Sequence, residues 1–366
     1  MKLDAARIAE QFRFSGELLR VLPHGTGHIH DTYAVWFRRR DGSSRRYLLQ
    51  RINHYVFRDP EGLMGNIAAV TDHLRTGIAA KGGDPERETL TLVPTRDGNT
   101  QLKTANGEYW RAYLFIEGAT AYAVARDDAH VHSVGRAFGD FHTLLADFPA
   151  EQLRETIPDF HNTPKRLQSL EQAVSGNASN RASGARPEID FVFQRAHRLS
   201  TLLDLRDSGA LPLRVTHNDT KIDNVLIDDE TGEGICVIDL DTVMPGLLAY
   251  DFGDAVRAAT NSAAEDERDL AKVSVDLGAY EQLVRGFLDA SRGIWTAEEG
   301  NQLCFSSWLL TLELGMRFLT DHLNGDVYFK VHRQDHNLDR CRSQLAMVKD
   351  MEDKFELMQT IVEAHC

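Results

Sequence analysis

The sequence contains few cysteines and no paired cysteine motif. Only four of its 366 residues are cysteines, and none of them form a C-x-x-C pair. They are Cys236, Cys304, Cys341 and Cys366. This scarcity argues against a disulfide framework and against a zinc site, and it fits reduced thiols in a cytoplasmic protein.

Long apolar runs and an excess of positive charge are also lacking. No apolar segment approaches the roughly 20 residues that a membrane-spanning helix needs. The first residues, Met1-Lys-Leu-Asp-Ala-Ala-Arg7, are charged and do not resemble a signal peptide. The formal net charge of −14 offers no basic surface for nucleic acid or for an anionic membrane. We therefore expect a cytoplasmic protein that binds neither of them.

What the chain does contain is one highly informative motif. It reads His217-x-Asp219-x-x-x-x-Asn224, and Asp239 follows fifteen residues after Asn224. Two short β-branched runs between Asn224 and Asp239 flank a turn-forming stretch, which predicts a β-hairpin. In an antiparallel hairpin the residue before the first strand lies beside the residue after the second. We therefore expect Asn224 and Asp239 to converge, with Asp219 one short loop away.

These oxygen-bearing side chains suit phosphoryl transfer. Asn224 and Asp239 are hard oxygen ligands of the kind that binds Mg²⁺ together with substrate phosphates. Asp219, a separate carboxylate, suits a base that accepts the proton of a hydroxyl nucleophile and holds it in line. The alternative is an ordinary polar turn. The spacing of all four residues, with apolar strand residues between them, favours the functional interpretation.

A glycine-containing loop runs into the first predicted strand pair. Glycine lets backbone N–H groups approach phosphate oxygens closely, so a strand, a glycine turn and a second strand can form a flap over a nucleotide. Gly25, Gly27 and His28 are the candidate contacts, and His30 is an alternative donor. An ordinary hairpin turn with solvated histidines is the competing interpretation.

The order of predicted elements indicates an α+β protein with two lobes. A chain of this length, with 42% hydrophobic residues, can bury one large core or two moderate ones. We expect a sheet-rich N-lobe over residues 1–117, a hinge at Glu117-Gly118 and a mainly helical C-lobe over residues 118–366. The polar tract 173–186 is expected to be a mobile surface connection. Helices are expected over residues 1–20, 61–81, 128–145 and 188–205, and strands over the segment ending at 37 and over 46–52, 89–94 and 108–116.

Two carboxylates after the motif have roles that the sequence leaves open. Asp254 is expected to cap the free N–H groups at a helix start. Asp251 either caps the same helix or braces the loop that carries Asp219 through its backbone N–H groups.

A charged stripe runs along a predicted helix over residues 305–323. Glu313, Arg317 and Asp321 occupy positions i, i+4 and i+8 in an otherwise apolar segment. From the pattern alone, a solvated and charge-paired stripe is favoured. The alternative is that the arginine fork reaches substrate hydroxyls or the charge of a transferring phosphate.

Taken together, these motifs resemble those of the aminoglycoside phosphotransferase/choline kinase superfamily, relatives of protein kinases that phosphorylate small hydroxyl compounds. More narrowly, the chain is similar to the N-acetylhexosamine 1-kinases. The resemblance spans nearly the whole chain. Its main strings are Gly27-His-Ile29, Thr32-Tyr33, Phe115-Ile-Glu117, Phe138-Gly-Asp-Phe141, Val215-Thr-His-Asn-Asp-Thr-Lys221, Ile238-Asp-Leu-Asp-Thr242, Met244-Pro-Gly246, Asp251-Phe-Gly-Asp254, Gly315-Met-Arg-Phe-Leu319, Gly325-Asp326 and Tyr328-Phe329.

The resemblance implies a bilobal protein-kinase-like fold and a defined set of ligands. ATP would lie in the cleft with its adenine near Phe115 and Glu117, and Mg²⁺ would bind Asn224 and Asp239. Asp219 would face the anomeric hydroxyl of GlcNAc or GalNAc, giving an N-acetyl-α-hexosamine 1-phosphate. Arg317 and Tyr328 would face the sugar, which contradicts the interpretation of that helix as a solvated and charge-paired stripe. We expect a monomer that binds only these small molecules.

One departure from the kinase pattern concerns the phosphates. Kinases place a lysine on the third strand, but the segment Tyr47-Leu-Leu-Gln-Arg-Ile52 has none. Gln50 or Arg51 is the candidate substitute. Two alternatives therefore stay open: a kinase for another small alcohol, such as an aminoglycoside, a choline-like or a methylthioribose-like compound, and a catalytically inactive kinase-like binding module.

Overall fold

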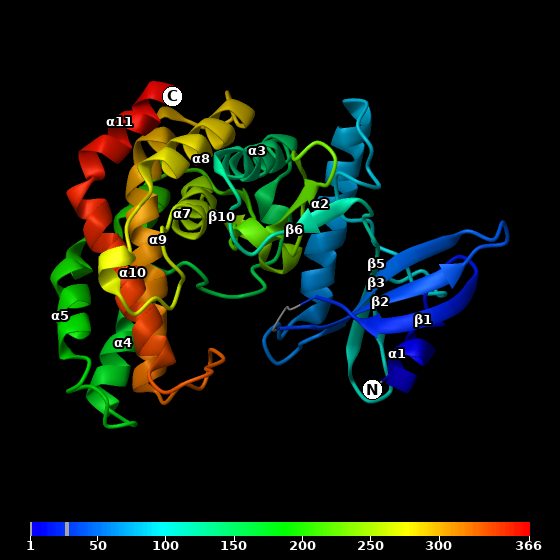
Figure 1. The fold of residues 1–366 in the computed structure, drawn as a ribbon, viewed down its shortest axis with the longest axis horizontal. Coiled ribbons are helices and arrows are strands. Elements are labelled where there is room, and N and C mark those ends of the chain that lie inside the picture. Colours follow the sequence, from blue (N-terminus) through cyan, green and yellow to red (C-terminus); the bar gives the residue numbers. More distant parts are fainter. Residues whose placement is uncertain (1, 26–28) are drawn as a thin grey trace.

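The computed structural model describes residues 2–25 and 29–366, and its N-terminal part is built on one antiparallel sheet. The strand order is β1-β2-β3-β5-β4. We call residues 2–114 the sheet region (Figure 1). Its elements are α1 (Lys2–Ala9), β1 (Glu17–Pro23), β2 (Asp31–Arg38), β3 (Ser44–Ile52), α2 (Pro60–Ala80), β4 (Leu102–Lys103) and β5 (Tyr109–Leu114).

Residues 119–366, which we call the helical region, contain most of the helices and three short strand pairings. β6 pairs with β8, β8 with β9, and β7 with β10. The strands are β6 (Ala119–Ala121), β7 (Arg214–Thr216), β8 (Val225–Asp228), β9 (Gly234–Val237) and β10 (Met244–Gly246). The helices are α3 (Asp128–Leu144), α4 (Thr163–Gly176), α5 (Arg186–Arg195), α6 (Thr201–Asp207), α7 (Leu248–Ala259), α8 (Leu277–Ala290), α9 (Ala297–Leu323), α10 (His336–Asp353) and α11 (Phe355–His365).

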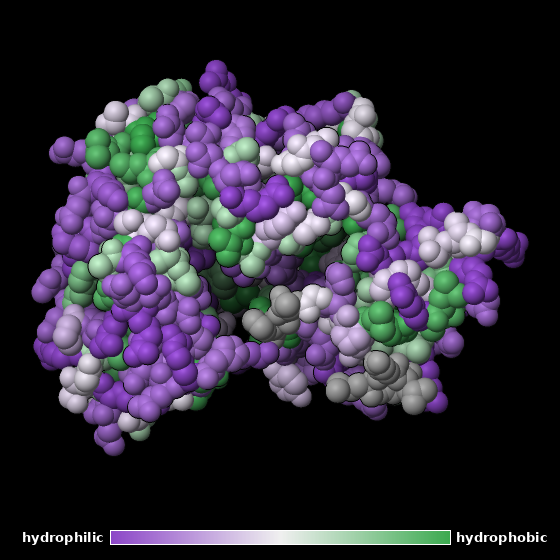
Figure 2. Space-filling view, in the orientation of Figure 1, coloured by the Kyte–Doolittle hydropathy of each residue, from purple (hydrophilic) through white to green (hydrophobic). Residues whose placement is uncertain are grey.

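The architecture is therefore mixed α+β, with a sheet followed by helices, as the sequence predicts. The two regions lie on opposite sides of Figure 1, and the surface is hollowed between them in Figure 2. The predicted lobe boundary at residues 117 and 118 stays a prediction. No helix within the described residues is long and apolar enough to span a membrane.

Two apolar cores hold these regions. A small core lies on the sheet face next to α1 and includes Phe12, Val35 and Leu49. A large core extends from α2 through the helical region. Helix α2 shows how the sequence builds it: Asp59 caps the helix by accepting from the Gly62 N–H, and apolar residues recur every three or four positions.

Helices α3 and α8 approach each other closely because each contributes a glycine at the contact. A Cβ atom on Gly135 would lie 2.5 Å from the carbonyl oxygen of Leu283. A Cβ atom on Gly286 would meet the carbonyl oxygen of His132. This close packing sets the position of Phe138 on α3, whose ring contacts the loop that carries Asp219.

Several predicted elements are confirmed and others need correction. The strands ending at 37 and spanning 46–52, the helices 61–81 and 128–145, the strand 108–116 and the hairpin after Asn224 all form. The helix predicted over residues 1–20 is wrong beyond Ala9, because Gly16 takes a positive φ of 112° and the pairing with β2 begins at Glu17. Segment 89–94 hydrogen-bonds to β5 but forms no regular strand.

The connection before Asp219 also differs from expectation. The helix predicted over residues 188–205 is divided into α5 and α6 by a 3-10 turn. The polar tract 173–186 is anchored to the end of α9: the Ser179 hydroxyl donates to the Leu323 carbonyl, and Arg181 pairs with Asp326. Its polar side chains therefore bind a neighbouring helix.

Candidate active site

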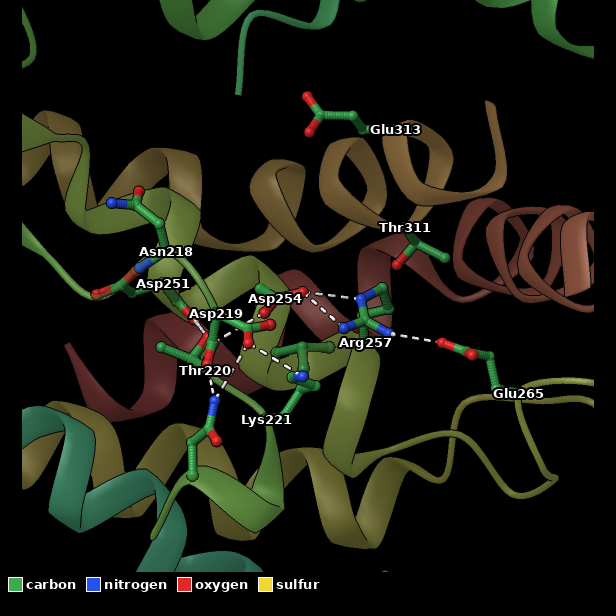
Figure 3. Close-up of polar contacts among 12 residues, drawn as sticks. Asn218, Asp219, Thr220, Lys221, Asp251, Asp254, Arg257, Glu265, Thr311 and Glu313 are labelled. Carbon is green, nitrogen blue, oxygen red and sulfur yellow. Dashed lines mark hydrogen bonds and ion pairs between the residues drawn. The ribbon is translucent and has the colours of Figure 1, made fainter. Parts of the chain in front are cut away.

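Two buried carboxylates on α7 hold the loop that carries Asp219 by accepting hydrogen bonds from its backbone. Asp251 accepts hydrogen bonds of 2.7 Å from the backbone N–H groups of both His217 and Asn218. Asp254 accepts a 2.9 Å bond from the N–H of Thr220. Figure 3 shows both carboxylates beside the loop. Of the two roles that the sequence leaves open for Asp251, the structure shows bracing of this loop. The prediction that Asp254 caps a helix start is wrong.

His217 connects this loop to the strand that precedes Asp239. Its Nδ1 accepts from the Asp219 N–H at 3.2 Å, so the proton of the neutral ring lies on Nε2. That Nε2 donates to the Ile238 carbonyl at 2.8 Å. The ring packs edge-on against Phe138, with 5.7 Å between centroids. His217 therefore positions the loop and is not available as a base.

Asp219 is the partly exposed carboxylate at the tip of this loop. Its side chain is 30% exposed, and one oxygen lies 3.0 Å from the Lys221 ammonium group. The Asn224 amide donates to the backbone carbonyl of Asp219 at 2.7 Å. Figure 3 shows Lys221 directed at Asp219. The carboxylate is thus held in place while it remains open to a substrate.

The sequence reasoning did not select Lys221, although its position two residues after Asp219 could have drawn attention to it. Burial alone would lower the pKa of Lys221, but the carboxylates of Asp219, Asp223 and Asp239 together raise it above the ordinary value. The side chain is therefore a fixed positive charge next to the candidate base.

The hairpin brings Asn224 and Asp239 next to each other. Val225 pairs with Val237, and the Ile238 N–H donates to the Asn224 carbonyl at 2.9 Å. Asp239 takes a left-handed conformation, with φ 59° and ψ 54°, at the end of the second strand. The predicted convergence is therefore present in the backbone, whereas the role of the two residues as metal ligands stays a prediction.

The electrostatics around Asp239 favour a cation. Burial, followed by the nearby Asp241 and Asp219 carboxylates, raises the pKa of Asp239 to about 8. The described residues contain no group of three or more His, Cys, Asp and Glu side chains that could hold a metal ion. Mg²⁺ needs only one or two protein oxygens when substrate phosphates supply the rest. Asp239 with the Asn224 amide fits that pattern.

Asp241 lies two residues after Asp239, and side chains from the sheet region donate hydrogen bonds to its carboxylate. The Arg111 guanidinium binds both of its oxygens, and Nη2 lies 2.8 Å from Oδ2. His30 accepts from the Asn53 N–H at Nδ1, so its neutral ring carries the proton on Nε2 and donates to Asp241 Oδ2 at 2.7 Å. His30 thus binds a carboxylate of the protein. The sequence reasoning selected neither Arg111 nor Asp241.

The two candidates for the missing strand lysine lie on opposite faces of the sheet, because successive strand residues alternate. Gln50 accepts from Arg111 Nε at 2.9 Å and so faces Asp241. Arg51 pairs with Asp31 and Glu108 on the other face. This geometry contradicts the predicted phosphate contact of Arg51 and leaves Gln50 as the candidate.

Of the remaining nucleotide candidates, Gly25 follows β1, and Phe115 and Glu117 follow β5. Gly25 takes a positive φ of 75°, whereas Gly27 and His28 are outside the described residues. Phe115 and Glu117 both contact Arg46 of β3: the guanidinium carbon lies 3.5 Å from the Phe115 ring centroid, and Nε donates to Glu117 at 3.0 Å. A contact of these residues with adenine stays a prediction.

The two carboxylates of the charged stripe on α9 are buried. The prediction of a solvated and charge-paired stripe is therefore wrong. Glu313 is buried and accepts from the Thr163 hydroxyl at 2.6 Å, with His161 Nδ1 at 3.0 Å. Asp321 is buried too, and it accepts from the backbone N–H groups of residues 327–329. It thereby shapes the segment that carries Tyr328.

Arg317 lies between these two carboxylates on α9 and is partly buried. Its guanidinium carbon is 5.5 Å from the ring centroid of Phe160 and 5.7 Å from that of Phe329. Phe160 precedes His161, whose Nε2 lies 3.4 Å from the Asn218 carbonyl. These contacts connect Arg317 to the loop that carries Asp219. Tyr328 is 65% exposed.

The comparisons with known proteins agree with this geometry. A model of the Phosphotransferase enzyme family (APH) matches residues 20–285. A microcompartment-associated aminopropanol kinase is 18% identical with a TM-score of 0.61, and the match covers 97% of this chain and 98% of that one. An aminoglycoside phosphotransferase from Alicyclobacillus acidocaldarius is 14% identical with a TM-score of 0.65, over 97% and 95% of the two chains.

A choline kinase from Cryptosporidium parvum is 12% identical with a TM-score of 0.59, over 94% and 92% of the two chains. At these identities the structures establish a shared kinase-like fold and nothing narrower. The family match covers well over half of the sequence and includes Asp219, Asn224 and Asp239. The chain therefore belongs to the phosphotransferase enzyme family.

Proposed function

We propose that the protein is an ATP-dependent kinase that phosphorylates the C1 hydroxyl of an N-acetylhexosamine, GlcNAc or GalNAc. The proposal of phosphoryl transfer rests on one juxtaposition: a partly exposed Asp219 beside the pair Asn224 and Asp239. The choice of C1 and of the acetamido sugar rests on the resemblance of such strings as Val215-Thr-His-Asn-Asp-Thr-Lys221 to the N-acetylhexosamine 1-kinases.

In this proposal the side chains divide the chemistry among themselves. Asp219 accepts the hydroxyl proton and holds the oxygen in line with the γ-phosphorus. Lys221 fixes the Asp219 carboxylate at 3.0 Å and adds positive charge near the transferring group. Asn224 and Asp239 would hold Mg²⁺, which when bound neutralises charge on the β- and γ-phosphates.

The observation that bears on the acceptor is a pair of arginines, Arg166 and Arg317, neither of which forms an ion pair within the described residues. Arg166 on α4 donates to the Phe160 carbonyl at 2.7 Å, and its Nε is buried without a partner among the described residues. Burial, and next the nearby Arg317 guanidinium, lower the pKa of Arg166. Arg317 itself has no hydrogen-bonding partner in the described part of the chain. The neighbouring carboxylate of Glu313 is already taken by His161 and Thr163.

Two guanidinium groups without a hydrogen-bonded carboxylate favour an acceptor rich in oxygen atoms over one with ammonium groups. Choline, ethanolamine and aminopropanol, after which several similar structures are named, each carry a cationic nitrogen. A sugar acetamide instead offers a carbonyl oxygen that a guanidinium can bind. This argument favours the sugar over the alternative of an amino-alcohol or aminoglycoside acceptor.

The test is an acceptor panel with ATP and Mg²⁺, read out as ADP release. We expect GlcNAc and GalNAc to be the best substrates, galactose to be poorer, and choline and kanamycin to be the poorest. Asp219→Asn should be inactive with all of them and serves as the control for contaminating kinases. Preference for choline or kanamycin would overturn the sugar assignment. No turnover with any acceptor, despite binding of MgATP, would favour the inactive binding module.

A further inference from the structure

The sheet region reaches the proposed metal site through a buried ion pair between Arg111 and Asp241. Arg111 is 2% exposed, and Asp241 is also 2% exposed. Arg111 comes from the central part of β5, whereas Asp241 lies in the 3-10 turn Leu240–Thr242 directly after Asp239. This contact therefore joins two parts of the chain that are 130 residues apart.

All three nitrogens of the Arg111 guanidinium donate to acceptors within the protein. Nη1 and Nη2 bind the two oxygens of Asp241, and Nε donates to Gln50 Oε1 at 2.9 Å. The Gln50 amide in turn donates to the Thr32 hydroxyl at 3.1 Å. Neither two-pronged edge of the guanidinium is therefore free for a phosphate, because Asp241 occupies one edge and Gln50 occupies the Nε of the other. Any effect of Arg111 on the nucleotide must therefore pass through Asp241.

Asp241 also binds His30, which precedes β2. His30 donates to Asp241 Oδ2 at 2.7 Å, while its Nδ1 accepts from the Asn53 N–H. One carboxylate is thus held by a donor from β5 and by a donor from the residue that precedes β2. Asp239, two residues before it, keeps a left-handed backbone conformation, which an aspartate adopts only at some cost in free energy.

We propose that Arg111 is a positioning residue that links β5 to the proposed metal site, in a chain that has no lysine on the third strand. It fixes Asp241, and through Asp241 it fixes the direction of the Asp239 side chain and the position of His30. This inference rests on the proposed kinase function and deepens it. Gln50 occupies the strand position without charge and orients the Arg111 fork.

A purely structural pair would behave differently from a positioning pair. Breaking a buried ion pair destabilises a protein wherever the pair lies, because one charge is left without a partner. Arg195 and Glu352 provide the matched control: they form a two-pronged pair at 2.7 Å between α5 and α10. Residues that orient a metal ligand, in contrast, change metal affinity or activity by about 10- to 100-fold.

The experiment compares Arg111→Met, Arg111→Lys and Arg195→Met by calorimetric binding of MgATP and by turnover at varied Mg²⁺. Arg111→Met should weaken MgATP binding and raise the Mg²⁺ needed for half-maximal turnover by about tenfold or more, with the acceptor KM unchanged within about twofold. Arg111→Lys should lie between it and the unmodified protein. Arg195→Met should lower the melting temperature and leave both Mg²⁺ readouts unchanged.

Asp241→Asn covers the case in which Arg111→Met does not fold, and a double variant extends the test. Asp241→Asn keeps the shape of the turn and should give the same loss of MgATP affinity. Gln50→Lys in the Arg111→Met background returns a cation to the third strand and should restore part of that affinity. The inference is overturned if Arg111→Lys and Asp241→Asn bind MgATP like the unmodified protein. If the unmodified protein does not bind MgATP at all, the proposed function itself is overturned instead.

Discussion

The ammonium group of Lys221 lies 3.0 Å from a carboxylate oxygen of Asp219, so the candidate base is paired with a cation on its own loop. In a kinase mechanism this charge both directs the carboxylate and faces the place where the phosphoryl group transfers. Lys221→Met should therefore lower kcat by about 10²- to 10³-fold, the range for a lost stabilising donor. Steady-state kinetics should show this with little change in ATP affinity.

Lys221→Arg is the control for this prediction. It keeps the charge and can still pair with Asp219, so it should retain more activity than Lys221→Met. Equal activity of Lys221→Met and the unmodified protein would show that the ion pair only neutralises a surface carboxylate.

The base itself is tested by Asp219→Asn. The substitution keeps the size of the side chain and removes the proton acceptor, so turnover should fall by about 10²- to 10⁴-fold. ATP binding, measured by calorimetry, should stay nearly unchanged because the base contacts the acceptor hydroxyl. A variant that keeps more than about a tenth of the activity would remove Asp219 from this role.

The metal pair predicts an order of effects. Asp239→Ala should lose turnover and Mg²⁺-dependent ATP affinity, because the negatively charged ligand of the proposed metal is removed. Asn224→Ala should have the same effect more weakly, since an amide contributes only a dipole. Mg²⁺ titrations of both variants measure this order. A larger defect for Asn224→Ala would reassign the principal ligand.

The raised pKa of Asp239, about 8, adds a pH dependence. Because the folded pKa exceeds the unfolded one, ionisation of Asp239 disfavours the fold, and the stability of the metal-free protein should decrease as the pH rises from about 4 towards 8. A metal must displace this proton, so Mg²⁺ binding should strengthen by up to about tenfold per pH unit below pH 8. Calorimetry with MgATP at pH 7 and 8.5 measures the effect, and Asp239→Asn should abolish it.

The acceptor side is tested with Arg317→Lys. A lysine cannot reproduce a two-pronged guanidinium contact, so kcat/KM for the acetamido sugar should fall by about tenfold or more, a loss equivalent to roughly 1.4 kcal/mol. The melting temperature should change little, because Arg317 has no hydrogen-bonding partner among the described residues. Unchanged sugar kinetics would exclude Arg317 from the acceptor site.

The sequence was sufficient for the local parts of this site. The convergence of Asn224 and Asp239 follows from hairpin geometry, because the pairing of adjacent strands constrains which residues meet. The same holds for β2, β3, α2 and α3, whose apolar spacing matches one secondary structure clearly. The error at β1 arose because Leu18 and Leu19 fit an apolar helix pattern equally well, and only pairing with β2 decides between the two.

Long-range charge pairing could not be predicted. Glu313 and Asp321 have helical spacing with Arg317, yet their partners come from the segment around His161 and from the chain after α9. Likewise, nothing near Arg111 in the sequence points to Asp241. Such pairs are set by the packing of distant elements, and residue spacing along one helix or strand contains no information about them.

The central claim is phosphorylation of an acetamido sugar at its anomeric oxygen, and phosphorus NMR of the product tests it most directly. The reaction would contain the protein, ATP, Mg²⁺ and GlcNAc, with Asp219→Asn as the blank. We predict one new phosphomonoester signal that is coupled to the anomeric proton of the sugar. A signal coupled to the C6 protons, or no sugar phosphate while choline or kanamycin is phosphorylated, would contradict the account.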